Sequence, residues 1–153
     1  MMNLIKIRIS GCLLVLFLFI TCCEDFIDCE SQDDIKLKMS FYKESENDFI
    51  PDTLRDVTVL TIASGPDTIF TGINIISVGL PLNPASDTTV FVFSSPSMQD
   101  TLYFFYERMV HLVSPKCGGV VYFELKNLIS PYNDTIINKD VDIETDQNIQ
   151  VFF

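Results

Sequence analysis

Short segments in which apolar and polar residues alternate constrain the fold of this chain more than any other feature. The clearest begins at Ile35, with Leu37, Met39 and Phe41 each separated by one polar residue. A period of two places alternate side chains on opposite faces of a half-buried strand. Further segments rich in Val, Ile, Thr and Phe cover 57–63, 68–76, 88–93, 102–106, 110–113, 121–125, 135–137, 141–143 and 149–153.

Turn-forming residues separate these segments. The clearest clusters are 64–67, 83–84, 94–96 and 114–119, which are rich in Ser, Gly, Pro, Asp and Asn. Helical periodicity is almost absent. This pattern predicts an all-β fold, an antiparallel β-sandwich or barrel-like domain of about 8–10 strands. The ending Val151-Phe152-Phe153 predicts a last strand that belongs to a sheet.

The first 22 residues have the layout of a secretory signal. Lys6 and Arg8 precede an apolar run from Gly11 to Ile20, and a small residue and cysteines follow. This layout is typical of a helical signal peptide, predicted here over residues 1–22. A helix that spans a bilayer needs roughly 20 apolar residues, and this run has about half of them. A retained transmembrane helix is therefore the less favoured interpretation.

The end of this signal predicts a lipoprotein. Lipoprotein processing cuts before a cysteine, which then carries acyl chains. Cys23 fits this role better than the alternative, Cys22, because Ile20 stands three positions before Cys23 with small residues between them. Two or more acyl chains hold a protein stably on a membrane. We expect an acidic tether over 23–34, a β-sandwich domain over 35–153, and export to the outer membrane, on its periplasmic face or the cell surface.

The charge of the chain limits its partners. The net charge is −11, and the signal holds two of the ten basic residues and none of the 21 acidic ones, which leaves −13 on the remainder. Nucleic-acid binding needs clustered Lys and Arg, so it is excluded. The expected partners are the membrane, through the acyl chains, and an envelope protein or a glycan.

Two further cysteines, Cys29 and Cys117, remain after the lipidation site. Exported proteins can hold disulfides, so a Cys29–Cys117 bond is expected, although sequence leaves two free thiols open. The alternative is a thiol-dependent envelope enzyme that uses Cys117 with His111, the single histidine, as its base. A zinc site on Cys29, Cys117 and His111 lacks the usual ligand spacing.

Four acidic residues alternate near the end of the chain, at Asp140, Asp142, Glu144 and Asp146. On a strand they would share one face, which could gather Ca²⁺ or keep an edge strand from pairing with other chains. An EF-hand loop from Asp140 is excluded, because its required glycine and glutamate are replaced by Thr145 and Val151. No nucleophile elbow, P-loop or dinucleotide fingerprint occurs, so we expect no catalytic residues, no metal and no cofactor.

An Asp-Thr pair followed by an apolar residue or threonine occurs five times. Asp favours a turn and Thr favours the start of a strand, which explains the pair structurally. The triplet also resembles the O-glycosylation acceptor of Bacteroidota envelope proteins. The candidate acceptors are Thr53, Thr68, Thr88, Thr101 and Thr135.

Three local motifs together resemble an uncharacterised lipoprotein family of Bacteroidota. They are Leu80-Pro81-Leu82, the aromatic segment from Asp100 to Tyr106, and the turn Ser114-Pro115-Lys116-Cys117-Gly118. The terminal strand and the anchor followed by Asp28-Cys29 fit the same family. The resemblance implies a lipid-anchored β-domain with no known activity. The acids after Cys23 resemble surface-export signals of that phylum. The resulting hypothesis is a non-catalytic binding or accessory module of the cell envelope.

Overall fold

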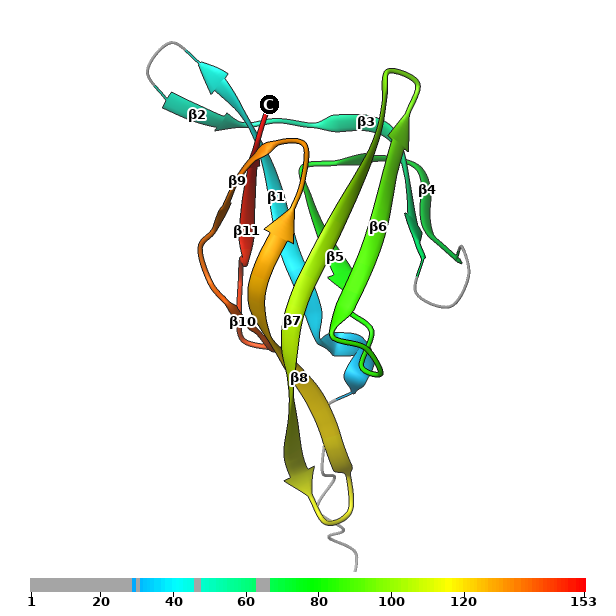
Figure 1. Ribbon diagram of the computed structural model, residues 1–153, viewed down its shortest axis with the longest axis vertical. Helices are drawn as coiled ribbons and strands as arrows, with labels where there is room; N and C mark the ends of the chain where they lie inside the picture. The colour runs from blue at the N-terminus through cyan, green and yellow to red at the C-terminus, as the bar shows by residue number, and fades with distance from the viewer. Residues whose placement is uncertain (1–28, 30, 46–47, 63–66) are drawn as a thin grey trace, which may run out of the picture.

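A computed structural model describes residues 29, 31–45, 48–62 and 67–153. The predicted signal peptide and both candidate lipidation sites, Cys22 and Cys23, lie outside the described residues. One short 3-10 helix precedes eleven strands within the described part (Figure 1): η1 (Gln32–Asp34), β1 (Lys36–Ser45), β2 (Asp48–Pro51), β3 (Leu54–Thr61), β4 (Asp67–Ile75), β5 (Ser77–Pro81), β6 (Thr88–Ser95), β7 (Met98–Ser114), β8 (Gly118–Ile129), β9 (Asn133–Ile136), β10 (Asp140–Val141) and β11 (Ile149–Phe152). No helix among these residues is long and apolar enough to cross a membrane.

The strands form two sheets, so the all-β prediction is confirmed. The five-stranded sheet has the order β2-β1-β11-β9, and β5 also pairs with β1. The registers place β5 and β2 one after the other along the same edge of β1, opposite β11. The six-stranded sheet has the order β10-β8-β7-β6-β3-β4.

One pairing departs from the predicted antiparallel arrangement. β1 and β11 run parallel, with Met39 opposite Ile149 and Phe41 opposite Val151. Parallel neighbours cannot be joined by a tight hairpin and need a long crossover. Here the crossover contains the whole six-stranded sheet, and the last strand closes against the first. The prediction that the C-terminal segment is held in a sheet is confirmed by β11.

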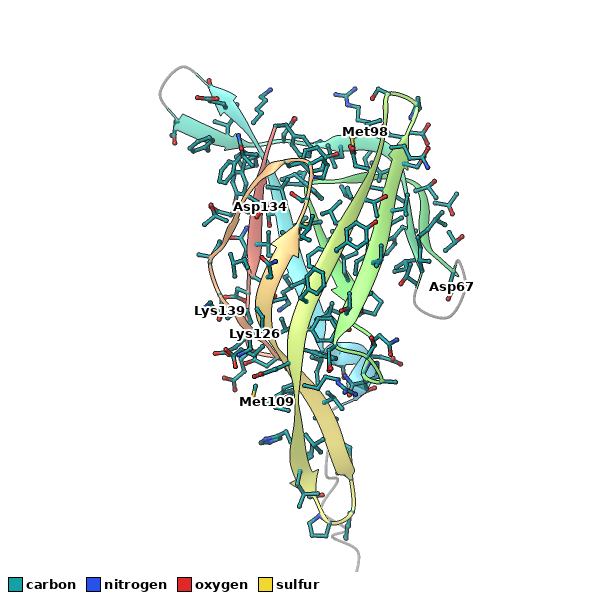
Figure 2. All side chains as sticks on the ribbon, in the orientation of Figure 1. Asp67, Met98, Met109, Lys126, Asp134 and Lys139 are labelled. Atoms are coloured by element: carbon teal, nitrogen blue, oxygen red, sulfur yellow. A yellow bond between two sulfur atoms is a disulfide. The ribbon has the colours of Figure 1, made fainter. Side chains whose placement is uncertain are left out.

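The core lies between the two sheets (Figure 2). Phe41 of β1 meets Phe93 of β6 edge to face, with ring centroids 6.2 Å apart. Phe91 and Phe104 form a second such pair at 5.7 Å. The alternation of apolar and polar residues in the sequence places these rings inside the core. Replacing one such phenylalanine by alanine typically lowers the free energy of unfolding by about 3–5 kcal/mol.

Two strands, β2 and β5, were not predicted. The sequence predicts no strand between the segment 68–76 and the turn at 83–84, but Ser77–Pro81 pairs with β1 and ends at Pro81. Proline fits there because β5 pairs with β1 alone, so the missing N–H of Pro81 disrupts no further ladder. β7 is continuous over Met98–Ser114 and joins the predicted segments 102–106 and 110–113 in one strand, with a register shift between Phe105 and Tyr106.

The segment predicted as tether ends in ordered structure. Ser31 and Asp34 form a capping box around η1. The side-chain amide of Gln32 accepts a hydrogen bond from the Val121 N–H at 2.7 Å and donates one to the Val121 carbonyl at 2.9 Å. Gln32 thereby occupies the edge of β8 next to the part that β10 covers. It fixes the start of the domain on that strand.

The prediction of a strand with four acidic residues on one face is wrong. β10 ends at Val141, and the Asp142 carboxylate accepts hydrogen bonds from the N–H and hydroxyl of Thr145. Such local side-chain bonds favour a turn over a strand. No group of three or more His, Cys, Asp and Glu residues able to hold a metal occurs among the described residues.

Candidate functional site: a groove on the outer face of the five-stranded sheet

The outer face of the five-stranded sheet carries side chains that alternate with the core residues. Tyr42 stands opposite Phe152, and Phe152 stands opposite Asn133, in one row across β1, β11 and β9. In the next row Glu44 stands opposite Phe49 of β2. Because strand neighbours on one face lie close together, the strand order itself assembles these groups.

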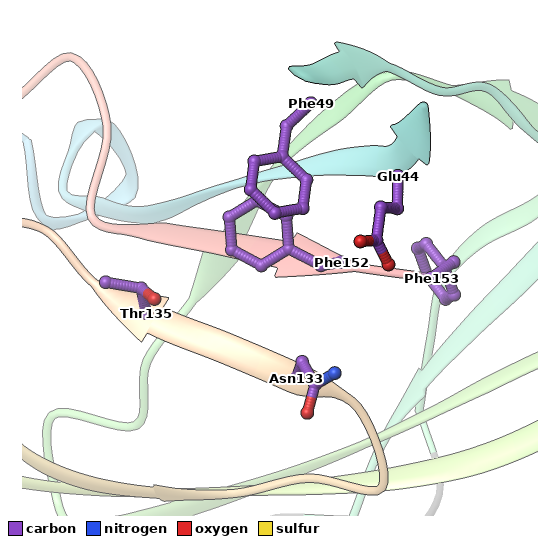
Figure 3. Close-up of a pocket in the computed structure, with 6 residues that line it drawn as sticks. All are labelled: Glu44, Phe49, Asn133, Thr135, Phe152 and Phe153. Carbon is purple, nitrogen blue, oxygen red and sulfur yellow. The ribbon is translucent and has the colours of Figure 1, made fainter. Parts of the chain in front are cut away.

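Four of these side chains, Glu44, Phe49, Asn133 and Phe152, border a groove of about 440 Å³, within the range of small-ligand sites. It lies between β2 and β9, over the ends of β1 and β11 (Figure 3). Its lining residues are Glu44, Phe49, Asn133, Thr135, Phe152 and Phe153.

The groove has an aromatic wall. The ring of Phe49 lies over that of Phe152 with centroids 4.4 Å apart, and Tyr42 packs on Phe152 at 5.8 Å. Phe49 is 51 % exposed, so about half of this side chain remains accessible to solvent although it packs on Phe152. An exposed aromatic ring that is fixed by a neighbour is typical of a binding surface.

Polar groups face this wall from β9 and β1. Asn133 and Thr135 are exposed on β9 and supply an amide and a hydroxyl. Glu44 adds a carboxylate beside Phe153. The amide and the hydroxyl can donate and accept hydrogen bonds, and the carboxylate accepts them. The groove therefore sets an amide, a hydroxyl and a carboxylate around an aromatic surface.

Tyr132 packs against the ring of Phe153. The two rings meet edge to face at 4.6 Å, and the Tyr132 hydroxyl donates to the Asp100 carboxylate. Burial, followed by the hydrogen bond and charge of Asp100, raises the pKa of Tyr132. The hydrogen bond to Asp100 and the ring contact with Phe153 together fix this end of the groove.

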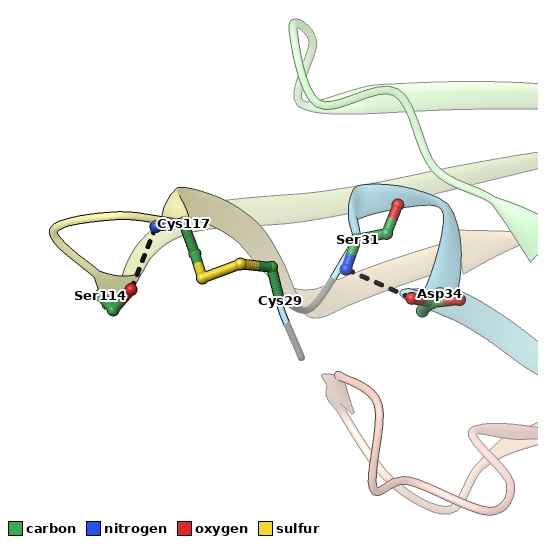
Figure 4. The surroundings of a disulfide bond; sticks show 5 residues. All are labelled: Cys29, Ser31, Asp34, Ser114 and Cys117. Atoms are coloured by element: carbon green, nitrogen blue, oxygen red, sulfur yellow. Dashed lines mark hydrogen bonds between the residues drawn. A yellow bond between two sulfur atoms is a disulfide. The ribbon is translucent and has the colours of Figure 1, made fainter. Parts of the chain in front are cut away.

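Cys29 and Cys117 form a disulfide that joins the start of the domain to the turn between β7 and β8 (Figure 4). Their Cα atoms are 5.5 Å apart. The Cys117 N–H donates to the Ser114 hydroxyl at 3.0 Å, which closes the turn. The bond engages both sulfur atoms, so the thiol required by the alternative enzyme and two of the ligands of the zinc alternative are not free.

His111 lies on β7 and stacks on the ring of Tyr122, with centroids 5.0 Å apart and planes 9° from parallel. It is exposed at the end of the molecule opposite the groove. Its position beside the disulfide turn gives it no free thiol to activate.

The five candidate glycosylation threonines differ in access. Thr53, Thr68 and Thr135 are exposed, whereas Thr88 and Thr101 are half-buried in β6 and β7. Thr135 also lines the groove, so a glycan on its hydroxyl would occupy the site.

Sequence reasoning missed the groove. One signal could have indicated it: Phe152 and Phe153 are adjacent at the end of a strand, so one of the two rings has to leave the core. The other lining residues come from strands that are distant in sequence, and β2 itself was not predicted.

The sequence pattern of a family of unknown function (DUF6452) matches residues 56–153. The chain belongs to this family. The match confirms the expected membership of an uncharacterised family and covers β9 and β11 of this DUF6452 protein, but not Glu44 and Phe49, which complete the groove. No curated protein and no solved structure matches the chain.

Proposed function

We propose that this DUF6452 protein is a non-catalytic, lipid-anchored module of the cell envelope that binds a neutral glycan in the groove. The single observation that carries the binding proposal is the fixed, half-exposed Phe49 ring opposite the amide of Asn133 and the hydroxyl of Thr135. The proposed anchor rests on the signal and Cys23. The disulfide fits the oxidising compartment that export would provide.

A glycan fits these groups better than an apolar ligand. A sugar ring offers one face of C–H groups to an aromatic ring and a rim of hydroxyls to amides, hydroxyls and carboxylates. The groove is open rather than enclosed, as a chain of sugar units requires. The protein is strongly acidic, which disfavours an anionic glycan.

The test is calorimetric titration of the protein with two neutral probes, an N-acetylglucosamine tetramer and a xylose tetramer. At least one should bind the protein. Phe49→Ala should weaken that binding by about tenfold, which is the equivalent of 1.4 kcal/mol, because it removes the stacking surface. Ile62→Ala is the matched control, since Ile62 is 50 % exposed but does not line the groove.

The control variant should bind like the unmodified protein. If neither tetrasaccharide binds, the glycan proposal is contradicted. Equal affinities of Phe49→Ala and the unmodified protein for the bound tetrasaccharide would also contradict it. A peptide that binds instead, by adding a strand to the exposed edge of β9 or β2, would replace it with a protein-binding function.

A further inference from the structure

The β7–β8 hairpin extends beyond the body of the molecule. Residues 108–123, named here the hairpin arm, project at one end of the long axis, while β2 and the C-terminus lie at the other (Figure 1). The core between the sheets does not reach its tip, because β7 is exposed from Glu107 to Leu112. The arm therefore presents side chains to whatever lies at that end.

The arm exposes apolar side chains at its tip. Val110 is 79 % exposed and Leu112 is 67 % exposed, more than any other large hydrophobic residue that the structure describes. Alternation places both on the same face of β7. Opposite Leu112 stands Gly119, which has no side chain to cover it. The result is a small apolar edge on an otherwise acidic protein.

The charge of the arm differs from that of the chain. No acidic residue occurs between Glu107 and Glu124, whereas Arg108, His111 and Lys116 all lie in this stretch. The chain as a whole carries a net charge of −11. Acidic side chains lie at the base of the arm, where Asp87 pairs with Arg108 and borders the same hollow as Glu107 and Val110. The tip itself, residues 109–119, carries none of the charges that an anionic lipid surface repels.

The disulfide fixes the arm beside the start of the domain. Cys29 is bonded to Cys117 in the turn of the arm, and Gln32 pairs with Val121 on its β8 strand. Cys23 stands six residues before Cys29. Six extended residues span at most about 20 Å, so acyl chains on Cys23 would hold the tip within that distance of the lipid headgroups.

We propose that the hairpin arm docks on the phospholipid bilayer through Val110 and Leu112, as a second contact beside the acyl anchor. This inference rests on the anchor in the proposed function. Asp28 and Glu30 flank Cys29, so the contact depends on apolar side chains more than on charge. Docking at this end turns the groove at the opposite end away from the membrane.

The chain contains no tryptophan, so single tryptophans can report depth in the membrane. The two matched reporters are Leu112→Trp on the arm and Phe49→Trp at the far end of the molecule. The lipidated full chain is reconstituted into vesicles of phosphatidylethanolamine and phosphatidylglycerol with brominated acyl chains, which quench tryptophan. Leu112→Trp should lose about half of its emission, because interfacial side chains lie 5–10 Å deep, within reach of the bromines. Phe49→Trp should keep its emission.

The outcomes separate the arm from the anchor. If the protein floats with the vesicles but neither reporter is quenched, the arm proposal is overturned and the anchor stands. If the protein does not float with the vesicles, the anchor fails and the arm proposal fails with it. A blue-shifted but unquenched Leu112→Trp would show that a protein surface covers the arm, which also overturns the proposal. Val110→Trp, on the same face, provides a second reporter if Leu112→Trp does not fold.

Discussion

Tyr106 shows how single residues fix the loops of this fold. It is buried, and its hydroxyl donates to the Asn83 carbonyl at 3.0 Å, accepts from the Asn83 N–H at 3.1 Å and lies 2.6 Å from the Thr89 hydroxyl. A tyrosine that bonds back to the backbone in this way is a recurring device of β-sandwiches. It secures the connection from β5 to β6, which contains Pro84.

Two tyrosines make the stability of the protein sensitive to alkaline pH. Burial is the largest cause of the raised pKa of Tyr106, and burial followed by the Asp100 hydrogen bond raises that of Tyr132. In the unfolded chain both ionise near the usual pKa of about 10. The folded state therefore holds more protons above this pH, and its stability is complete below about pH 10 and falls as the pH rises towards the folded pKa values.

The measurement is the urea midpoint as a function of pH from 8 to 11. Tyr106→Phe should lower stability by about 1–3 kcal/mol at pH 8, because the Asn83 groups and Thr89 lose their partner. The Tyr106→Phe, Tyr132→Phe double variant should show a shallower alkaline decline than the unmodified protein. Tyr103→Phe, at an exposed position, is the control. Parallel alkaline declines for the unmodified protein and the double variant would contradict this account.

At the scale of elements, the hairpin arm depends on the disulfide. The Cys29–Cys117 bond spans 88 residues of sequence, and in the chain-entropy model closing so long a loop contributes roughly 4–5 kcal/mol. The base of the arm is held to the body by the buried Phe123, by the Arg108–Asp87 ion pair and by the paired bonds between Gln32 and Val121. The disulfide is the tie nearest to its tip.

The Cys29→Ser, Cys117→Ser variant should therefore lose about 2–5 kcal/mol of stability. Native-state amide exchange should rise most in residues 118–122 of β8 and much less in β6, because the arm opens locally while the core remains closed. Cys12→Ser, within the predicted signal, is the matched control and should leave exchange in the domain unchanged. Uniformly faster exchange in both strands would show that the bond supports the whole domain rather than the arm.

The elements that the sequence predicts are those defined by local pattern. The alternation from Ile35 to Phe41 and the hairpin across Ser94–Pro96 are visible in the residues themselves, and the structure has both. The parallel partner of β1 is not visible, because no local signal links residue 39 with residue 149. Similarly, the hydrogen bonds from Thr145 to the Asp142 carboxylate favour a turn where the alternating acids predicted a strand. These contacts are visible only in the three-dimensional structure.

The candidate site was less predictable than the fold for the same reason. Phe49, Glu44, Asn133 and Phe152 are brought together by the order β2-β1-β11-β9, which depends on the parallel closure. Chemistry-bearing residues that stand out in the sequence, such as His111 and Cys117, lie at the other end of the molecule. Local prominence of a residue type therefore did not indicate the groove.

At the scale of the whole molecule, the two ends have different chemistry. One end carries the aromatic groove, and the other carries the disulfide, Cys29 and the apolar arm. An anchor on Cys23 would place the second end at the membrane and leave the groove accessible. The fold places the two sites at opposite ends, and this one proposed modification would set how both face the membrane.

The most direct test of this account is the intact mass of the protein purified from the membranes of its source cells. Loss of residues 1–22 together with acylation of Cys23 should give the mass of residues 23–153 increased by that of the lipid. Cys23→Ala should abolish the lipid mass, whereas Cys12→Ser should not change the mature protein. A mature chain that begins at another residue, or one that begins at Cys23 without lipid, would contradict the central claim.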